Sequence, residues 1–122
     1  MIFQHTLPQV LNRSKTQTRR IMKPQESAIR DANGAIVSVT HNGRTKWTVG
    51  KTYAVQPSRN AAQVARMRIT RLVDEPVSAI SHDDAIAEGY TSREAFFETW
   101  QHIHGDNSFD MRVWVITFEL VD

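Results

Sequence analysis

The segment that most constrains the fold is the strictly alternating run over residues 112–121. Its members fall into two sets: Trp114, Ile116, Phe118 and Leu120 alternate with Val113, Val115, Thr117 and Glu119. Residues two apart lie on one face of a β-strand, so this pattern predicts a strand with two different faces. A strand needs hydrogen-bonding partners for its backbone, so other segments must supply the rest of a sheet.

Further strands are predicted between residues 35 and 73. Residues 35–40 have strand composition and lie between the turn dipeptides Asn33-Gly34 and Asn42-Gly43, which predicts a hairpin excursion closing near Trp47. Thr52–Val55 follows Gly50 and is ended by Pro57. Val64–Val73 alternates apolar with polar residues until Arg71 falls on the apolar side, so the strand should end or bulge there.

Three segments carry the start and stop signals of short helices. Thr6 precedes a helix ending near Leu11, and Ser81 opens another that Gly89 ends. The third follows the capping-box sequence 91–94 and presents Phe96, Trp100 and Ile103 at helical spacing before Gly105. The order of helix, strands, two helices and strand lacks regular βα alternation. We therefore expect one α+β domain over residues 1–122, a small and mostly antiparallel sheet or barrel with short helices at its ends.

Composition excludes several classes of protein. The chain has no cysteine, which excludes disulfide frameworks, thiolate zinc sites and a cysteine nucleophile. No apolar run reaches the ~20 residues that a membrane-spanning helix needs, and the first five residues lack the order of a signal peptide. We expect a cytoplasmic protein, monomeric by default, with no cofactor, no metal and no membrane partner.

The net charge of +2 conceals a strong asymmetry. Residues 1–71 hold 13 Lys and Arg against two acids, a net charge of +11, whereas residues 72–122 hold two Arg against 11 acids, a net charge of −9. This division favours a face that meets phosphate. The alternative is that the two halves form ion pairs with each other across the fold.

The densest chemical feature is the segment 13–23, which has five positive charges, two threonines, a glutamine and no acid. Such a segment can bind phosphate through charge-assisted hydrogen bonds, although a solvated basic edge strand would have the same composition. Glu88 is a second candidate, because it ends a helix where the helix dipole disfavours a negative charge. It is either exposed there or compensated by a cation such as Lys15 or Arg20.

Other residues that could form sites are weaker candidates. His102 and His104 lie about 200° apart around a helix, so they cannot share a metal ion there. The three tryptophans are predicted to lie in the core, while Trp47 and Tyr53 flank the turn at Gly50 and could stack on a base.

These motifs resemble the ASCH-domain proteins, small bacterial and phage relatives of the PUA family. The resemblance is carried by Lys15-Thr16-Gln17-Thr18-Arg19-Arg20 with Lys23-Pro24, and continues through residues 47–57, Asp84–Gly89 and 111–118 in the family's order. The sequence departs from the family at Arg13-Ser14, where a glycine and a basic residue are usual, and at Lys51, where an acid is common.

The resemblance implies a PUA-like β-barrel with a cleft that receives RNA or a nucleotide, and a modified base is one ligand that such a cleft would take. In such a binding module Lys15, Arg19, Arg20 and Lys23 would contact phosphate. Gln17, Thr18 and Glu88 would read base edges, with Tyr53 as a further contact.

Some members of the family hydrolyse the amide of N4-acetylcytidine, and the resemblance therefore implies an amidohydrolase as the alternative. Thr18 would be the nucleophile, Lys15 its activator and Glu88 the handler of the leaving-group proton. Lys15 and Thr18 are three residues apart, so their convergence requires irregular backbone between them. Replacing Glu88 by Gln should then abolish hydrolysis with little loss of stability. A ribonuclease is less favoured, because the loop contains no histidine.

Overall fold

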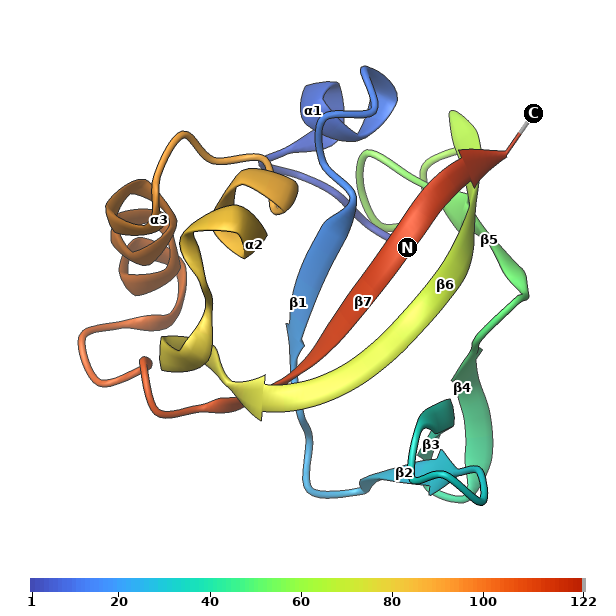
Figure 1. Cartoon of the computed structure of the whole chain (residues 1–122). Helices are drawn as coiled ribbons and strands as arrows, with labels where there is room; N and C mark the ends of the chain where they lie inside the picture. The colour runs from blue at the N-terminus through green and yellow to red at the C-terminus, as the bar shows by residue number, and fades with distance from the viewer. Residues whose placement is uncertain (122) are drawn as a thin grey trace.

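The computed structural model describes residues 1–121, and its larger sheet is built around the segment that alternates in the sequence (Figure 1). The sheet is antiparallel and has the order β1-β7-β6-β5. Its strands are β1 (Gln17–Ile21), β5 (Thr52–Val55), β6 (Ala65–Pro76) and β7 (Arg112–Val121). The strand predicted over residues 112–121 is confirmed at both ends. Because β1 pairs with β7 on one side, its other edge stays free of strand partners within residues 1–121.

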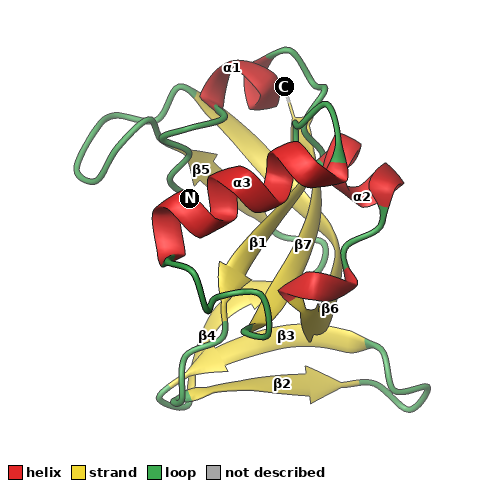
Figure 2. Ribbon diagram, turned by 90° about the vertical axis from the view of Figure 1, so that its left-hand side faces the viewer, coloured by secondary structure: helices red, strands yellow, loops and turns green. Residues whose placement is uncertain are grey.

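A smaller antiparallel sheet packs across one end of the larger one (Figure 2). It has the order β2-β3-β4, from β2 (Glu26–Arg30), β3 (Ile36–His41) and β4 (Arg44–Thr48). Asn42 and Gly43 both have positive φ, 51° and 77°, as a two-residue hairpin turn requires. The predicted excursion is therefore confirmed, and residues 26–30 add a third strand that composition did not indicate.

The α+β class is confirmed, but the strands of residues 1–121 form two sheets rather than the closed barrel that we expected. No ladder joins the small sheet to the large one. Apart from the two sheets, a single parallel bridge between Ile2 and Gln56 ties the N-terminal segment beside β5. The strand connection 22–25 is short and Lys23 precedes Pro24, so β2 leaves the direction of β1 instead of extending the same sheet.

The two faces of β7 bury two different cores. Trp114, Ile116 and Phe118 pack between the sheets with Phe3 and Trp47. The alternate residues Val113 and Val115 pack on the other side, against the helices. The strict alternation in the sequence therefore reflects two apolar environments, one on each side of the central strand.

Four short helical segments lie to one side and at one end of the larger sheet (Figure 1). They are α1 (Leu7–Leu11), the 3-10 helix η1 (Val77–Ala79), α2 (His82–Ala87) and α3 (Arg93–His104). The Oγ of Ser81 accepts from the Asp84 N–H at 3.0 Å, which confirms the predicted cap of α2. No helix within residues 1–121 combines the length and apolarity needed to cross a lipid bilayer.

Three details of the prediction are tested by local geometry. The helix α3 is capped by Ser92, which accepts from the Ala95 N–H, rather than by Thr91 as the capping-box sequence suggested. Ile103 is 45% exposed instead of packing with Phe96 and Trp100, because its side of the last turn borders an open cleft. The predicted irregularity at Arg71 is confirmed by a register shift between Ile69 and Arg71.

Candidate functional site

A cleft of about 680 Å³ opens along the free edge of β1. One wall is formed by residues 1–6 and by Lys46 and Trp47 of β4. The other wall is formed by α3 and by the end of α2. Six of the predicted site residues line it together, namely Lys15, Thr18, Arg19, Arg20, Lys23 and Glu88.

Strand geometry divides the basic segment between two faces. Gln17 and Arg19 face α2, where both bond to Asp84. Thr18 and Arg20 face the core between the sheets, because they pair in register with Ile116 and Trp114. Lys15 lies before the regular strand, which begins at Gln17. Residues from both faces reach the cleft because it follows the edge of the strand.

Lys15 and Glu88 form a buried ion pair at one end of this cleft. The Lys15 Nζ donates to the Glu88 Oε1 and to the Glu88 carbonyl oxygen, both at 2.7 Å. Their side chains are 3% and 7% exposed. The charge of Glu88 is therefore compensated by Lys15, which was one of the two alternatives that the sequence left open. The other alternative, an exposed glutamate at the end of a helix, is wrong.

The C-terminus of α2 sets the position of Glu88. The Tyr90 N–H donates to the Ala85 carbonyl at 3.1 Å, and the Gly89 N–H donates to the Ile86 carbonyl at 3.0 Å. Gly89 has a φ of +101°, and these bonds form a Schellman motif in which Glu88 is the last residue before the left-handed glycine. A Cβ on Gly89 would lie 3.3 Å from the Gln9 Cβ and 3.5 Å from the Lys15 Cβ, so only glycine fits without strain.

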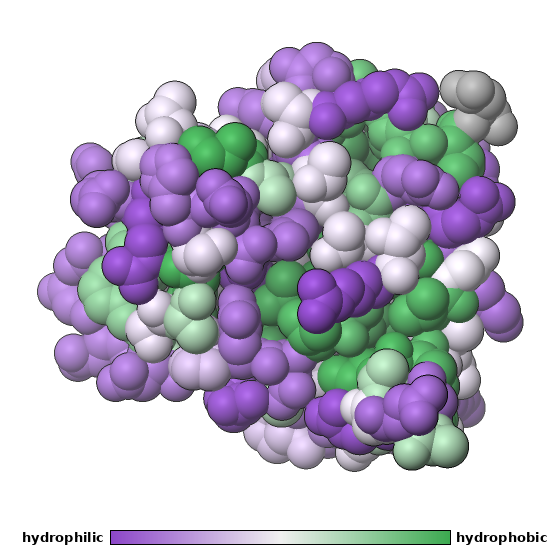
Figure 3. Space-filling model, in the orientation of Figure 1, coloured by the Kyte–Doolittle hydropathy of each residue, from purple (hydrophilic) through white to green (hydrophobic). Residues whose placement is uncertain are grey.

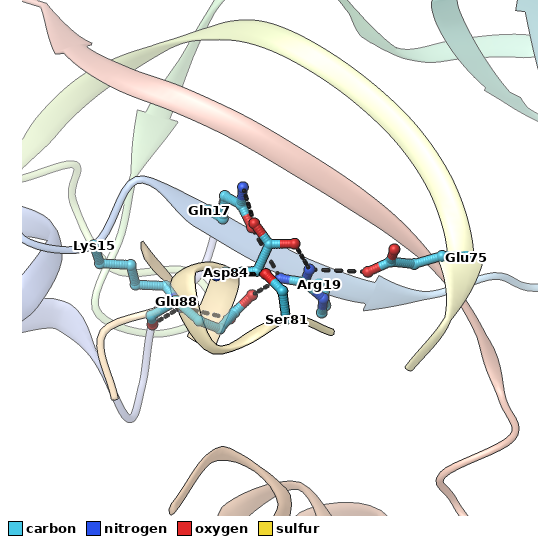
Figure 4. Close-up of polar contacts among 7 residues, drawn as sticks. All are labelled: Lys15, Gln17, Arg19, Glu75, Ser81, Asp84 and Glu88. Atoms are coloured by element: carbon cyan, nitrogen blue, oxygen red, sulfur yellow. Dashed lines mark hydrogen bonds and ion pairs between the residues drawn. The ribbon is translucent and has the colours of Figure 1, made fainter. Parts of the chain in front are cut away.

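Arg19 joins three carboxylates into one network (Figure 4). Its Nη1 donates to the Glu88 Oε2 at 2.9 Å, and its Nη2 to the Glu75 Oε1 at 2.9 Å and the Asp84 Oδ2 at 3.4 Å. The Arg19 side chain is fully buried. Its guanidinium therefore faces protein carboxylates, which is a different environment from the phosphate contact that we expected.

Burial also changes the proton affinity of the groups around Glu88. Burial lowers the pKa of Lys15, and the Glu88 carboxylate only partly opposes that change. Burial raises the pKa of Tyr90, and the negative charge of Glu88 raises it further. Lys15 thus gives up its proton more readily than an exposed lysine, which is the property that a general base near neutral pH needs.

Aromatic side chains line both walls of the cleft. Phe3 and Trp47 lie on the side of the N-terminal segment and β4. Tyr90, Phe96 and Trp100 lie on the side of α3. The Trp100 ring contacts His104, with centroids 4.1 Å apart, and His104 also lines the cleft. A planar ring bound here would meet aromatic surface on either side.

The structure adds residues to the predicted site and leaves two outside it, Gln17, which bonds to Asp84, and Tyr53. Tyr53 does not line the cleft, because its hydroxyl accepts from the Thr48 N–H at 2.7 Å beneath the turn at Gly50. Lys46, Tyr90, Trp100 and His104 were not predicted as site residues. The helical spacing of Phe96 and Trp100 had shown an apolar face, but the sequence did not show that part of this face borders a cleft.

The basic and acidic halves of the sequence do pair across the fold. Lys15 and Arg19 bind acids of the second half, and so do the more exposed Arg30 and Arg68, which contact Asp74 and Glu119 at 3.3 and 3.8 Å. Within residues 1–121 no group of three or more His, Cys, Asp or Glu side chains could hold a metal ion.

Comparison with known proteins relates the chain to solved structures. No family model and no curated protein matches the sequence. An ASCH domain from Lactobacillus crispatus JV V101 superposes with a TM-score of 0.61 at 15% identity, covering 93% of this chain and 68% of that one. Protein EF3133 from Enterococcus faecalis V583, assigned to the family DUF984, superposes with a TM-score of 0.58 at 19% identity, covering 94% of this chain and 69% of that one. Both likenesses span nearly the whole chain, so they describe its complete fold.

Proposed function

Because this chain has the ASCH-domain fold, we propose that its cleft binds a nucleobase carried by RNA or by a nucleotide. The observation that carries the proposal is the Lys15–Glu88 pair at one end of a cleft that has aromatic side chains on both walls. An ammonium and a carboxylate held 2.7 Å apart present a donor and an acceptor to the same ligand. Paired donor and acceptor groups are what the edge of a base requires.

The burial of the pair increases its power to discriminate. Counted as whole residues, Lys15, Thr18 and Glu88 are each 5% exposed or less, so a ligand that reaches them leaves water behind. A base whose edge fails to match them would leave buried polar groups without hydrogen-bond partners, and each such group costs about 1–3 kcal/mol of binding free energy. The site is therefore suited to selecting one base, or one modification of a base, among similar rings.

Binding is tested by titrating single-stranded RNA oligonucleotides and the four ribonucleoside monophosphates into the protein and measuring heat release. We expect one base to bind preferentially, and Thr18→Val to weaken it about tenfold, because the substitution removes one hydroxyl without changing the shape. The exposed Thr70 on β6 provides the matched control, since Thr70→Val should leave the affinity unchanged. Equal affinity of the parent and Thr18→Val would remove the buried end of the cleft from recognition.

A second candidate function, hydrolysis of an acylated nucleoside such as N4-acetylcytidine, is favoured by the lowered pKa of Lys15. In that reaction Lys15 acts in its neutral form: the Thr18 Oγ attacks the acyl carbon as its proton passes to the Lys15 Nζ, and Lys15 then gives that proton to the amine as the C–N bond breaks. Water then releases the acyl group from the threonine ester. Both oxygens of Glu88 accept hydrogen bonds from cations, Lys15 and Arg19, so Glu88 fixes the position of the Lys15 Nζ in this arrangement.

Hydrolysis is tested by incubating the protein with N4-acetylcytidine and following cytidine by chromatography. Release that disappears in both Lys15→Met and Thr18→Val would establish the enzyme. Release that persists in Thr18→Val would exclude the threonine as nucleophile, and absence of release leaves binding as the function of the cleft.

A further inference from the structure

We infer that the cleft contains an anion subsite formed by Arg20, Lys23 and Lys46, which receives a phosphate of the bound nucleotide. The inference rests on the proposed function and extends it, because such a subsite would select phosphorylated ligands over neutral nucleosides. The three cations line the cleft near β4, beyond the end that holds Lys15 and Glu88.

Arg20 is the fixed member of this subsite. Its Nη2 donates to the Ile2 carbonyl at 2.8 Å, and its guanidinium lies 5.2 Å from the centre of the Phe3 ring. Its Nε is buried and has no hydrogen-bond partner within residues 1–121. A buried donor without an acceptor is uncommon in folded proteins. The Arg19 Nε, also on a cleft-lining side chain, is likewise buried without a partner, so an acceptor that enters the cleft from outside the chain can serve either guanidinium.

Lys46 is held in place by a carboxylate beneath the cleft. Its Nζ lies 2.8 Å from the Glu26 Oε2 and 4.5 Å from the centre of the Trp47 ring. The side chain of Glu26 is fully buried, whereas that of Lys46 is 32% exposed, so the ammonium is anchored from below and accessible from above.

Glu26 also organises the rest of this end of the cleft. Its Oε1 accepts from the Lys23 N–H at 3.0 Å and from the Trp114 Nε1 at 2.9 Å. Although burial favours its protonated form, hydrogen bonds from Lys46, Lys23 and Trp114 prevail and lower the pKa of Glu26 to about 2. Glu26 therefore stays ionised, and it holds the backbone from which the exposed Lys23 side chain extends.

The charge balance differs between the two ends of the cleft. Near α2, the cations Lys15 and Arg19 are matched by Glu88 and by Asp84 and Glu75. Near β4, the Lys46 ammonium pairs with the Glu26 carboxylate, whereas the side chains of Arg20 and Lys23 form no ion pair within residues 1–121. The His41 Nδ1 also lies 3.3 Å from the Glu26 Oε2. The surplus of positive charge therefore lies at the β4 end.

The spacing along β1 suits a single nucleotide. Thr18 and Arg20 lie on the same face two residues apart, which is about 7 Å along a strand. A ligand whose base reaches Thr18 can thus place a phosphate at Arg20. The phosphate can belong to a free nucleotide or to an RNA strand, since both present the same group.

The test compares each ribonucleoside with its 5′-monophosphate by calorimetry, in the parent and in the double variant Lys23→Ala/Lys46→Gln. For the preferred base we expect the phosphate to improve affinity at least about tenfold in the parent, and less than about threefold in the double variant. The matched control is Arg71→Ala/Lys51→Ala, which removes two cations from exposed positions outside the cleft. In this control the phosphate should improve affinity as much as in the parent. Urea unfolding of each variant checks that the fold is intact.

The outcomes separate the inference from the proposed function. Nucleoside and monophosphate binding equally well to the parent would overturn the subsite and leave base recognition standing. An equal loss in the control variant would also overturn it, because net charge would then explain the gain. If no nucleoside, nucleotide or oligonucleotide binds, the proposed function fails and the subsite with it. If the phosphate does improve affinity, the source of that phosphate is tested with an RNA of six nucleotides. Tighter binding of this RNA than of the monophosphate indicates that the subsite receives a phosphate of an RNA strand, and equal binding indicates a free nucleotide.

Discussion

Replacing Glu88 by Gln tests the central ion-pair network directly. The sequence suggested little loss of stability, because a glutamate at a helix end is commonly exposed. In the structure its two oxygens accept from Lys15 at 2.7 Å and Arg19 at 2.9 Å, and its side chain is 7% exposed. An amide keeps one acceptor but turns the other oxygen into a donor that opposes a guanidinium.

The expected cost follows from what each cation retains. Lys15 keeps the Glu88 carbonyl, and Arg19 keeps Glu75 and Asp84. Removing one member of a buried pair costs about 3–5 kcal/mol, and these remaining contacts favour the lower value, about 3 kcal/mol. For a domain of this size that corresponds to a fall in Tm of roughly 10 °C.

The assay is urea unfolding followed by tryptophan fluorescence, with Glu98→Gln as the control. Glu98 is exposed on α3 and carries the same charge, so its substitution should change the free energy of unfolding by less than about 0.5 kcal/mol. A Glu88→Gln variant as stable as this control would refute the argument that Glu88 compensates two buried cations.

Three further predictions concern the elements that support the site. Glu26 has its pKa lowered from 4.5 to about 2 in the folded state, so it contributes stability above pH 4.5 that is lost as the pH falls towards 2. Between pH 5 and pH 2 the parent should lose about 3 kcal/mol more of its free energy of unfolding than Glu26→Gln does. The same pH dependence in the parent and in Glu26→Gln would contradict the stabilising contacts of Glu26. Gly89→Ala should cost about 1–2 kcal/mol, because φ is +101° and the new Cβ meets Gln9; an unchanged Tm would contradict it. Ser81→Ala should lower the free energy of unfolding in urea by about 1 kcal/mol, because the Asp84 N–H loses its cap. Ser27→Ala, at an exposed position on β2 that caps no helix, should leave it unchanged.

Local patterns in the sequence were sufficient for much of the fold. The alternation over residues 112–121 predicted β7, the dipeptide Asn42-Gly43 predicted a hairpin turn, and Arg71 marked the bulge in β6. Each of these signals depends on residues adjacent in the chain, so backbone sterics and side-chain period determine them without reference to distant partners.

How the two sheets form and pack together depends on contacts between residues that lie far apart in the sequence. Residues 26–30 became a strand because β3 pairs with them, although Glu26, Ser27 and Arg30 give the segment little strand composition. Whether strands close into a barrel depends on where each edge meets another, which is a property of the complete packing.

The sequence by itself determined which residues carry charge, and it assigned those of α2, α3, β7 and most of β6 to their elements. It marked Lys15, Thr18 and Glu88 as candidates, and the structure brings them to one cleft. Only the tertiary structure decided what each cation faces. Arg19 and Arg20 are neighbours with the same chemistry, yet Arg19 binds carboxylates 56 to 69 positions away, while Arg20 lies over Phe3 and donates to the Ile2 carbonyl. Alternation places adjacent strand residues on opposite faces, and the elements that cover each face come from distant parts of the chain.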